Sequence, residues 1–248
     1  LITLALYMIL QKQDFAAGIL LALSTAKPQM AYLILPFVLL WALSTRRRDI
    51  IGGVVITGGL LLAATLILLP GWPLQWLGQM LDYPNYTSRI GSVLSTIANT
   101  MPGIRKSLSP FLHAVAYLYL LVEWVWAWGK EERWFIWTAL LTIVITNLAA
   151  YRTATTNFVM MLPVLFVIFC TWEARWKRTG KLGVWRSLIL LSFGLWGLFL
   201  LTIQGNEEAA AMYVLLPFLS LFGMWWVRWW YIRPPRVSVE EFIERFKR

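Results

Sequence analysis

The chain has 248 residues, of which 59% are hydrophobic and only 14% are charged. This composition excludes an ordinary soluble protein, because soluble domains carry roughly 25% charged residues. It also excludes a disordered chain, since 16 Trp, 13 Phe and 9 Tyr provide too much apolar surface to remain solvated. The lipid bilayer is therefore the expected environment of most of the chain.

The formal net charge is +10, which raises the question of a nucleic-acid partner. The lysines and arginines, however, fall between apolar runs, as they do in the loops of membrane proteins. We therefore expect no nucleic-acid partner. Cys170 and His113 are the only cysteine and histidine, so no metal site is expected, and the absence of a phosphate-binding or dinucleotide motif predicts no cofactor.

The N-terminal residues are apolar, and the chain starts with Leu rather than Met. Leu1 to Leu10 is followed at once by polar residues, without the basic region and small-residue cleavage site of a signal peptide. We expect that a further N-terminal portion, including more membrane helices, precedes Leu1.

Six apolar runs approach the length of about 20 residues that a helix needs to cross a bilayer. They are residues 50–69, 111–128, 134–150, 158–172, 185–203 and 212–231. Another apolar stretch, residues 15–43, is too long for one span and short for two. Because proline interrupts helices, Lys27-Pro28 predicts a tight helical hairpin, with a single kinked helix as the alternative.

The expected fold is thus an all-α polytopic transmembrane helical bundle of about eight to nine membrane helices, occupying residues 1–231. The hairpin reading places all but five of the 22 cations on one side, which the positive-inside rule makes cytoplasmic. A long external loop, residues 70–110, is expected on the other side, with a helix lying in the interface plane around Leu74, Leu77 and Leu81. Residues 232–248 are expected to form a cytoplasmic amphipathic tail.

The five remaining cations are the candidates for chemistry, because they run against the charge bias. They are Lys27, Arg89, Arg105, Lys106 and Arg152. Arg105 and Lys106 are expected to be solvated loop charges. An ionisable group at membrane depth, such as Lys27, is by default a functional candidate, and Lys with Arg is suited to a phosphate. The alternative is that Lys27 snorkels to the interface and Arg89 caps a helix.

A polar segment, residues 151–157, lies at the predicted external end of two spans. Thr155 and Asn157 either cap the helix that follows or bind a hydroxyl-rich ligand together with Arg152. Asp82 in the long loop is a weak candidate for a general base, because the sequence shows no partner that shifts its pKa. His113 is read as an interfacial side chain rather than a catalyst.

Residues 17–29, AGILLALSTAKPQ, followed by an apolar run ending in Arg46-Arg47-Arg48, resemble the GT-C class of polytopic glycosyltransferases. The nearest family is glycosyltransferase family 87, which includes bacterial mannosyltransferases that use polyprenyl-phosphate-mannose. The polar turn at 151–157 and the helix with Pro163 that follows are similar to the later half of that family. The resemblance implies that Lys27, with Gln29 beside it, neutralises the donor phosphate.

The resemblance further implies transfer of a hexosyl group, with mannose as the example, from a polyprenyl-phosphate-sugar to an acceptor glycan or lipid outside a bacterial plasma membrane. Enzymes of this class carry their acidic catalytic residue in the first external loop, which we expect to precede Leu1. Two other readings remain open at this point. One is a lipid or polyisoprenoid transporter or flippase, and the other is a non-catalytic membrane subunit.

Overall fold

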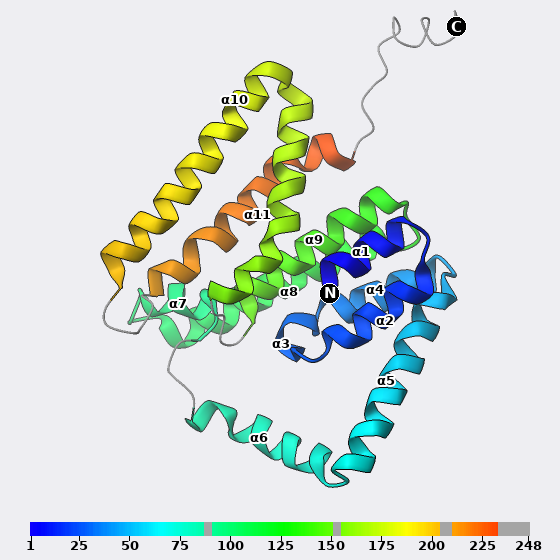
Figure 1. The fold of residues 1–248 in the computed structure, drawn as a ribbon. Coiled ribbons are helices and arrows are strands. Elements are labelled where there is room, and N and C mark those ends of the chain that lie inside the picture. Colours follow the sequence, from blue (N-terminus) through cyan, green and yellow to red (C-terminus); the bar gives the residue numbers. More distant parts are fainter. Residues whose placement is uncertain (87–90, 151–154, 204–209, 233–248) are drawn as a thin grey trace, which may run out of the picture.

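The computed structural model describes residues 1–86, 91–150, 155–203 and 210–232. Within these ranges the chain is helical and contains no strand (Figure 1), which confirms the all-α prediction. The helices are α1 (Ile2–Leu10), α2 (Asp14–Ser24), α3 (Pro28–Ala31), α4 (Ile34–Ser44), α5 (Arg48–Leu68), α6 (Trp72–Tyr86), α7 (Val93–Asn99), α8 (Arg105–Ala127), α9 (Glu132–Ala149), the 3-10 helix η1 (Thr155–Met161), α10 (Leu162–Thr202) and α11 (Ala210–Ile232).

Five helical segments of the described chain are long and apolar enough to cross a membrane. They are Arg48–Leu68, Arg105–Ala127, Thr155–Trp176, Thr179–Thr202 and Met212–Ile232. α2 and α4 are also apolar but have only 11 residues each, so each rises about 16 Å against a hydrocarbon core of about 30 Å. These features indicate an integral membrane protein.

The apolar stretch 15–43 reverses direction in its middle, as the hairpin reading predicts. α2 ends at Ser24, and after α3 and α4 the chain returns, so that Arg47 beyond α4 meets Asp14 at the start of α2. Arg47 Nε donates to Asp14 Oδ2 at 2.8 Å, and Arg47 Nη2 donates to the Ile9 carbonyl at 2.8 Å. A single kinked helix would keep these two ends apart, so the alternative is wrong.

α10 differs from the sequence prediction of two helices joined by a basic loop. Its backbone is helical throughout residues 162–202, yet Figure 1 shows it folding back on itself at its upper end. A Cβ atom built on Gly183 would lie 2.8 Å from the ring of Trp172, which places residues on either side of the bend in contact. The bend separates the two candidate spans, 155–176 and 179–202.

α9 is the central helix of the bundle. Of its 18 residues 15 are buried, and it contacts α4, α8, α10 and α11. The indole of Trp41 stacks on Phe135 with ring centroids 4.0 Å apart, and Phe37 stacks on the same ring at 5.7 Å. These contacts fix α4 against α9 near the beginning of α9.

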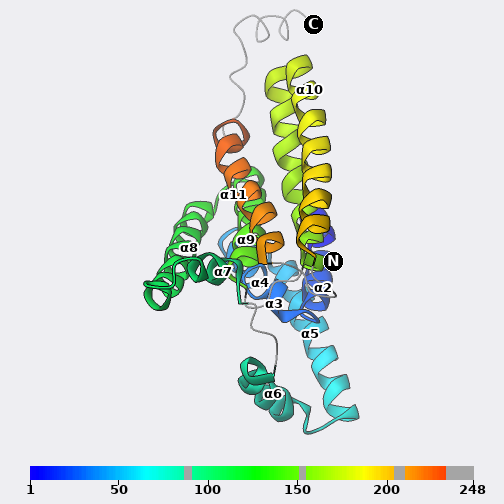
Figure 2. The same ribbon diagram turned by 90° about the vertical axis from the view of Figure 1, so that its left-hand side faces the viewer.

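The predicted external loop, residues 70–110, contains helices rather than irregular chain. α6 confirms the expected helix around Leu74 and Leu77, and these side chains are 79% and 48% exposed. Both views show α6 beyond the end of α5 and apart from the other helices (Figures 1 and 2). α7 and the beginning of α8 also fall within this stretch, since α8 begins at Arg105 and not at Phe111 as predicted.

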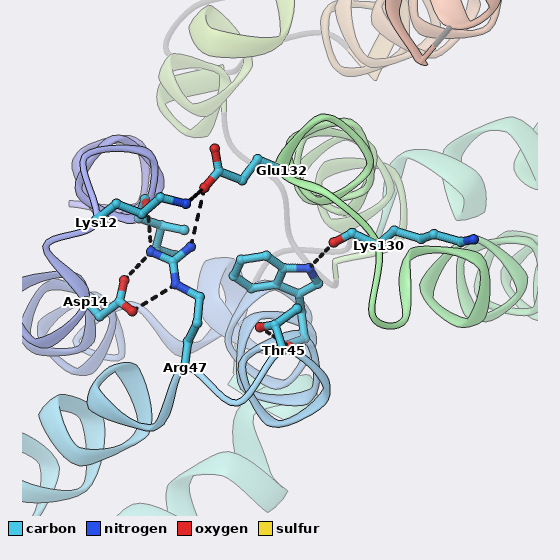
Figure 3. Close-up of polar contacts among 8 residues, drawn as sticks. Lys12, Asp14, Thr45, Arg47, Lys130 and Glu132 are labelled. Atoms are coloured by element: carbon cyan, nitrogen blue, oxygen red, sulfur yellow. Dashed lines mark hydrogen bonds and ion pairs between the residues drawn. The ribbon is translucent and has the colours of Figure 1, made fainter. Parts of the chain in front are cut away.

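Three loops that the charge pattern places on one side of the membrane meet in the structure. Lys12 follows α1, Arg47 follows α4, and Glu132 begins α9 (Figure 3). Lys12 Nζ forms an ion pair with Glu132, and Arg47 Nη1 lies 3.8 Å from Glu132 Oε1. We call Lys12, Asp14, Arg47 and Glu132 the ion-pair cluster. The ion-pair cluster supports the prediction that these three loops lie on the same side of the bundle.

Candidate functional site

The turn between α2 and α3 presents Lys27 at the tip of the hairpin. Pro28 is the first residue of α3, and Lys27 before it has φ −120° and ψ 79°, because a residue that precedes proline is excluded from the helical region. The hydroxyl of Ser24 donates to the Leu21 carbonyl at 2.6 Å, and that of Thr25 to the Ala22 carbonyl at 2.6 Å. These bonds satisfy two carbonyls in the last turn of α2. Lys27 follows this turn and is exposed.

Lys27 contacts Asn157, a residue of the polar segment that follows α9. Its Nζ donates to Asn157 Oδ1, across 130 residues of sequence. Asn157 lies in η1 and is only 4% exposed, so its amide is held by the surrounding bundle. The structure thus brings together two of the predicted site residues from different halves of the chain.

The other predicted site residues are distributed differently. Gln29 is half-buried in α3, and Thr155 is half-buried in η1, two residues before Asn157. Arg89 and Arg152 lie outside the described residues. Asp82 is exposed on α6, which stands apart from the hairpin (Figure 2). Its carboxylate is therefore not part of the Lys27 site.

The charge of Lys27 is not neutralised by a carboxylate in the described part of the chain, where its partner is a neutral amide. An ammonium with a neutral partner retains its attraction for an anion, and a phosphate oxygen can accept the remaining Lys27 protons. The Asn157 bond orients the ammonium without reducing its charge. Chemically, the site is suited to holding a phosphate headgroup.

A polar network around His113 was not predicted from the sequence. His113 Nδ1 lies 2.7 Å from the Ser109 carbonyl, and Nε2 lies 2.8 Å from Ser92 Oγ. Because a carbonyl only accepts, Nδ1 carries a proton, and Nε2 forms a hydrogen bond with the Ser92 hydroxyl. Ser92 Oγ also accepts from the Ser95 amide at 3.0 Å, which caps α7. The Ser-x-x-Ser pattern was the available signal for this cap.

Metal chemistry gains no support from the described residues, among which no group of three metal-ligating side chains comes together. Comparison of the chain with protein-family models, with curated proteins and with solved structures gives no match.

Proposed function

We propose that this protein is a membrane glycosyltransferase that transfers a hexosyl group, such as mannosyl, from a polyprenyl-phosphate-sugar to an acceptor glycan or lipid. The observation that carries the proposal is the contact between Lys27 and Asn157. It joins the lysine of the segment that resembles glycosyltransferase family 87 to the polar turn that resembles the later half of the same family. The two matching segments therefore contribute to one site.

The position of the site in the bundle also favours this reaction. Lys27 is at the tip of a hairpin whose two ends lie at the ion-pair cluster. Its helices are too short to cross the hydrocarbon core. A cation at such depth is costly unless an anion accompanies it. A lipid-linked phosphate can reach this depth, because its chain is dissolved in the bilayer.

In the proposed reaction the acceptor hydroxyl attacks the anomeric carbon, and the bond from that carbon to the phosphate oxygen breaks. Polyprenyl phosphate leaves with the bonding electrons, and Lys27 stabilises the charge that develops on its oxygen. A base must take the proton of the acceptor hydroxyl. Asp82 on α6 is too remote from Lys27 for this role.

The proposal includes a topology. In this topology we place α1, α2, α4 and α9 in the bilayer beside the five candidate spans, so that nine membrane helices form a GT-C-like bundle in which α2 and α4 enter the bilayer without crossing it. The ion-pair cluster faces the cytoplasm by the positive-inside rule, and the Lys27 site faces outward. The C-terminal tail is then cytoplasmic, and the membrane is a bacterial plasma membrane.

The proposal is tested by transfer of labelled mannose from polyprenyl-phosphate-mannose in membranes that contain the full protein. Lys27→Glu should lower the transfer rate about 100-fold, because it removes a charge that stabilises the leaving phosphate. Lys27→Arg should retain more activity, and Asn157→Ala should have a smaller effect, because the ammonium remains.

The matched control is Lys106→Glu, which reverses an exposed lysine outside the site and should leave transfer unchanged. Equal transfer by Lys27→Glu and the wild type, at equal amounts of inserted protein, would remove the proposal. Movement of the lipid headgroup across vesicles without a covalent product would support a flippase instead.

A further inference from the structure

An apolar groove lies between α4 and α8. None of the residues that line it belongs to the Lys27 site described above. The volume of the groove is about 140 Å³. The lining is formed by Phe37, Leu40 and Trp41 of α4 together with Leu121, Trp124, Val125, Ala127 and Trp128 of α8 and its C-terminal cap.

The groove exists because α9 separates the two helices that form its walls. α4 and α8 each pack on α9, and Phe135 of α9 stacks on both Phe37 and Trp41. Trp124 lies across the gap, with its ring centroid 5.5 Å from that of Phe37. Val125 and Trp128 are 70% and 55% exposed, so the outer rim is open to the surroundings of the bundle.

The two ends of the groove differ in chemistry. Toward the hairpin tip, the hydroxyls of Tyr32 and Tyr117 lie 3.1 Å apart and join the turn between α3 and α4 to α8. Toward the ion-pair cluster, Trp41 Nε1 donates to the Lys130 carbonyl at 3.3 Å. Figure 3 shows the Lys130 side chain extending away from Arg47. Its ammonium forms no ion pair within the described chain.

The cation-rich end of the groove carries a net positive charge. Four exposed cations lie in the two loops there, against two exposed carboxylates, Asp49 and Glu131. The cations are Arg46, Arg48, Lys130 and Arg133. Tryptophans beside basic residues mark the headgroup level of a bilayer, and basic sites between membrane helices bind anionic headgroups.

We propose that the groove binds one anionic phospholipid of the leaflet at the ion-pair cluster. One acyl chain lies between α4 and α8, and the phosphate is held by Lys130. This site is distinct from the Lys27 site and does not depend on the proposed transfer reaction.

The size and closure of the groove favour this occupant. A volume of about 140 Å³ is smaller than the roughly 300 Å³ at which pockets for compact ligands begin, so the groove receives a short segment of one acyl chain and not a whole ligand. The Tyr32–Tyr117 bond bridges the helices near the hairpin tip, whereas at the other end the lining residue Trp41 contacts the backbone of Lys130. A lipid with its headgroup at the cation-rich end therefore fits better than one that enters from the Lys27 side.

The test is native mass spectrometry of the purified full chain after addition of a phosphatidylglycerol or a phosphatidylcholine with identical acyl chains. One phosphatidylglycerol should be retained in preference to phosphatidylcholine. Lys130→Gln should lower its affinity about fivefold, which corresponds to the loss of one cation near an anionic lipid. The control Lys106→Gln removes an exposed lysine outside the groove and should have no effect.

A second pair of variants tests the place of the acyl chain. Val125→Trp fills the groove and should abolish retention, whereas Val115→Trp, on the same helix but outside the groove lining, should not. Equal retention of the two lipids, or an unchanged affinity in Lys130→Gln or Val125→Trp, would overturn the proposal. Displacement of phosphatidylglycerol by equimolar polyprenyl phosphate would overturn the assignment of the occupant.

Discussion

α5 and α9 are apolar helices of similar length with opposite environments. α5 is the most apolar of the five candidate spans, yet only Ile50 and Gly53 of its 21 residues are buried. α9 is not among those candidates, because Glu132, Arg133 and its polar residues lower its hydropathy, but 15 of its 18 residues are buried. Of these two helices, the more apolar one is therefore the more exposed.

The polar residues of α9 explain how a less apolar helix can occupy the centre. Thr142 Oγ1 donates to the Thr138 carbonyl at 2.7 Å, and Thr146 Oγ1 to the Thr142 carbonyl at 2.7 Å. The hydroxyls of Thr142 and Thr146 are therefore satisfied within their own helix, whereas the buried Thr138 hydroxyl has no hydrogen-bond partner in the described chain. Thr142 also accepts from Trp124 Nε1 at 3.0 Å, which ties α9 to α8. The bond from Trp124 requires a packed neighbouring helix, whereas a threonine bond to the carbonyl of its own helix also forms in exposed α5, where Thr65 Oγ1 donates to the Leu61 carbonyl at 2.9 Å.

The largest effect should come from the one place where α5 is tightly packed. A Cβ atom on Gly18 of α2 would lie 2.3 Å from the Ile50 carbonyl oxygen and 2.8 Å from Gly53 Cα. Backbone atoms cannot move aside cheaply, and close helix crossings in membranes need small residues. Gly18→Val should therefore abolish the monodisperse folded protein in size-exclusion chromatography.

The matched change for this experiment is Gly58→Val in the lipid-facing part of α5, where a Cβ atom meets nothing within 4 Å. This variant should elute and unfold as the wild type does. If both valine variants behave alike, the described contact between α2 and α5 is wrong.

A smaller effect is expected from truncation of a leucine on each helix. Leu140 of α9 is 2% exposed, whereas Leu60 of α5 is 67% exposed. Leu140→Ala should lower the free energy of unfolding by roughly 2–5 kcal/mol through the cavity it leaves. Leu60→Ala should cost little, because lipid chains fill the space. Denaturant unfolding in micelles measures both, and a reversed order would refute the assignment of α9 as the core.

The smallest effect should come from the acidic residue in the first turn of each helix. Glu132 of α9 pairs with Lys12, and their side chains are 37% and 68% exposed, so Glu132→Gln should cost up to about 1 kcal/mol. Asp49 is the acidic residue in the first turn of α5 and has no ion pair within the described chain. Asp49→Asn therefore measures the contribution of the helix dipole without an ion pair. The difference between the two variants should shrink in high salt, and a difference that persists in high salt would argue against the ion pair.

Much of the fold was predictable because apolar run length and proline position have direct structural meaning. The hairpin at Lys27-Pro28 and the helix around Leu74 followed from those signals. The continuity of α10 through residues 175–186 did not, because its basic residues are also good helix formers and the sequence pattern does not separate a loop from a helical bend. Which helix becomes central was also hidden, since hydropathy ranks α5 above α9.

The candidate site was predictable in part. Lys27 and Asn157 were both selected as polar residues in apolar surroundings, and the structure brings them into contact. Asp82 was selected only because carboxylates are rare on the predicted external side. It lies on α6, which stands apart from the hairpin that carries Lys27. The His113–Ser92 bond was missed because it joins two helices whose relative placement no local pattern encodes.

The hydrogen bonds of Arg47 have a consequence for biogenesis. During synthesis, Asp14 and the Ile9 carbonyl are available as soon as Arg47 emerges, so the hairpin can close early. Glu132, the other carboxylate near Arg47, is added only after α5 to α8 have been made. Its arrival places the start of α9 against a hairpin that already exists. The Arg47 guanidinium can therefore first hold the two ends of the hairpin together and later contact the beginning of α9, the central helix.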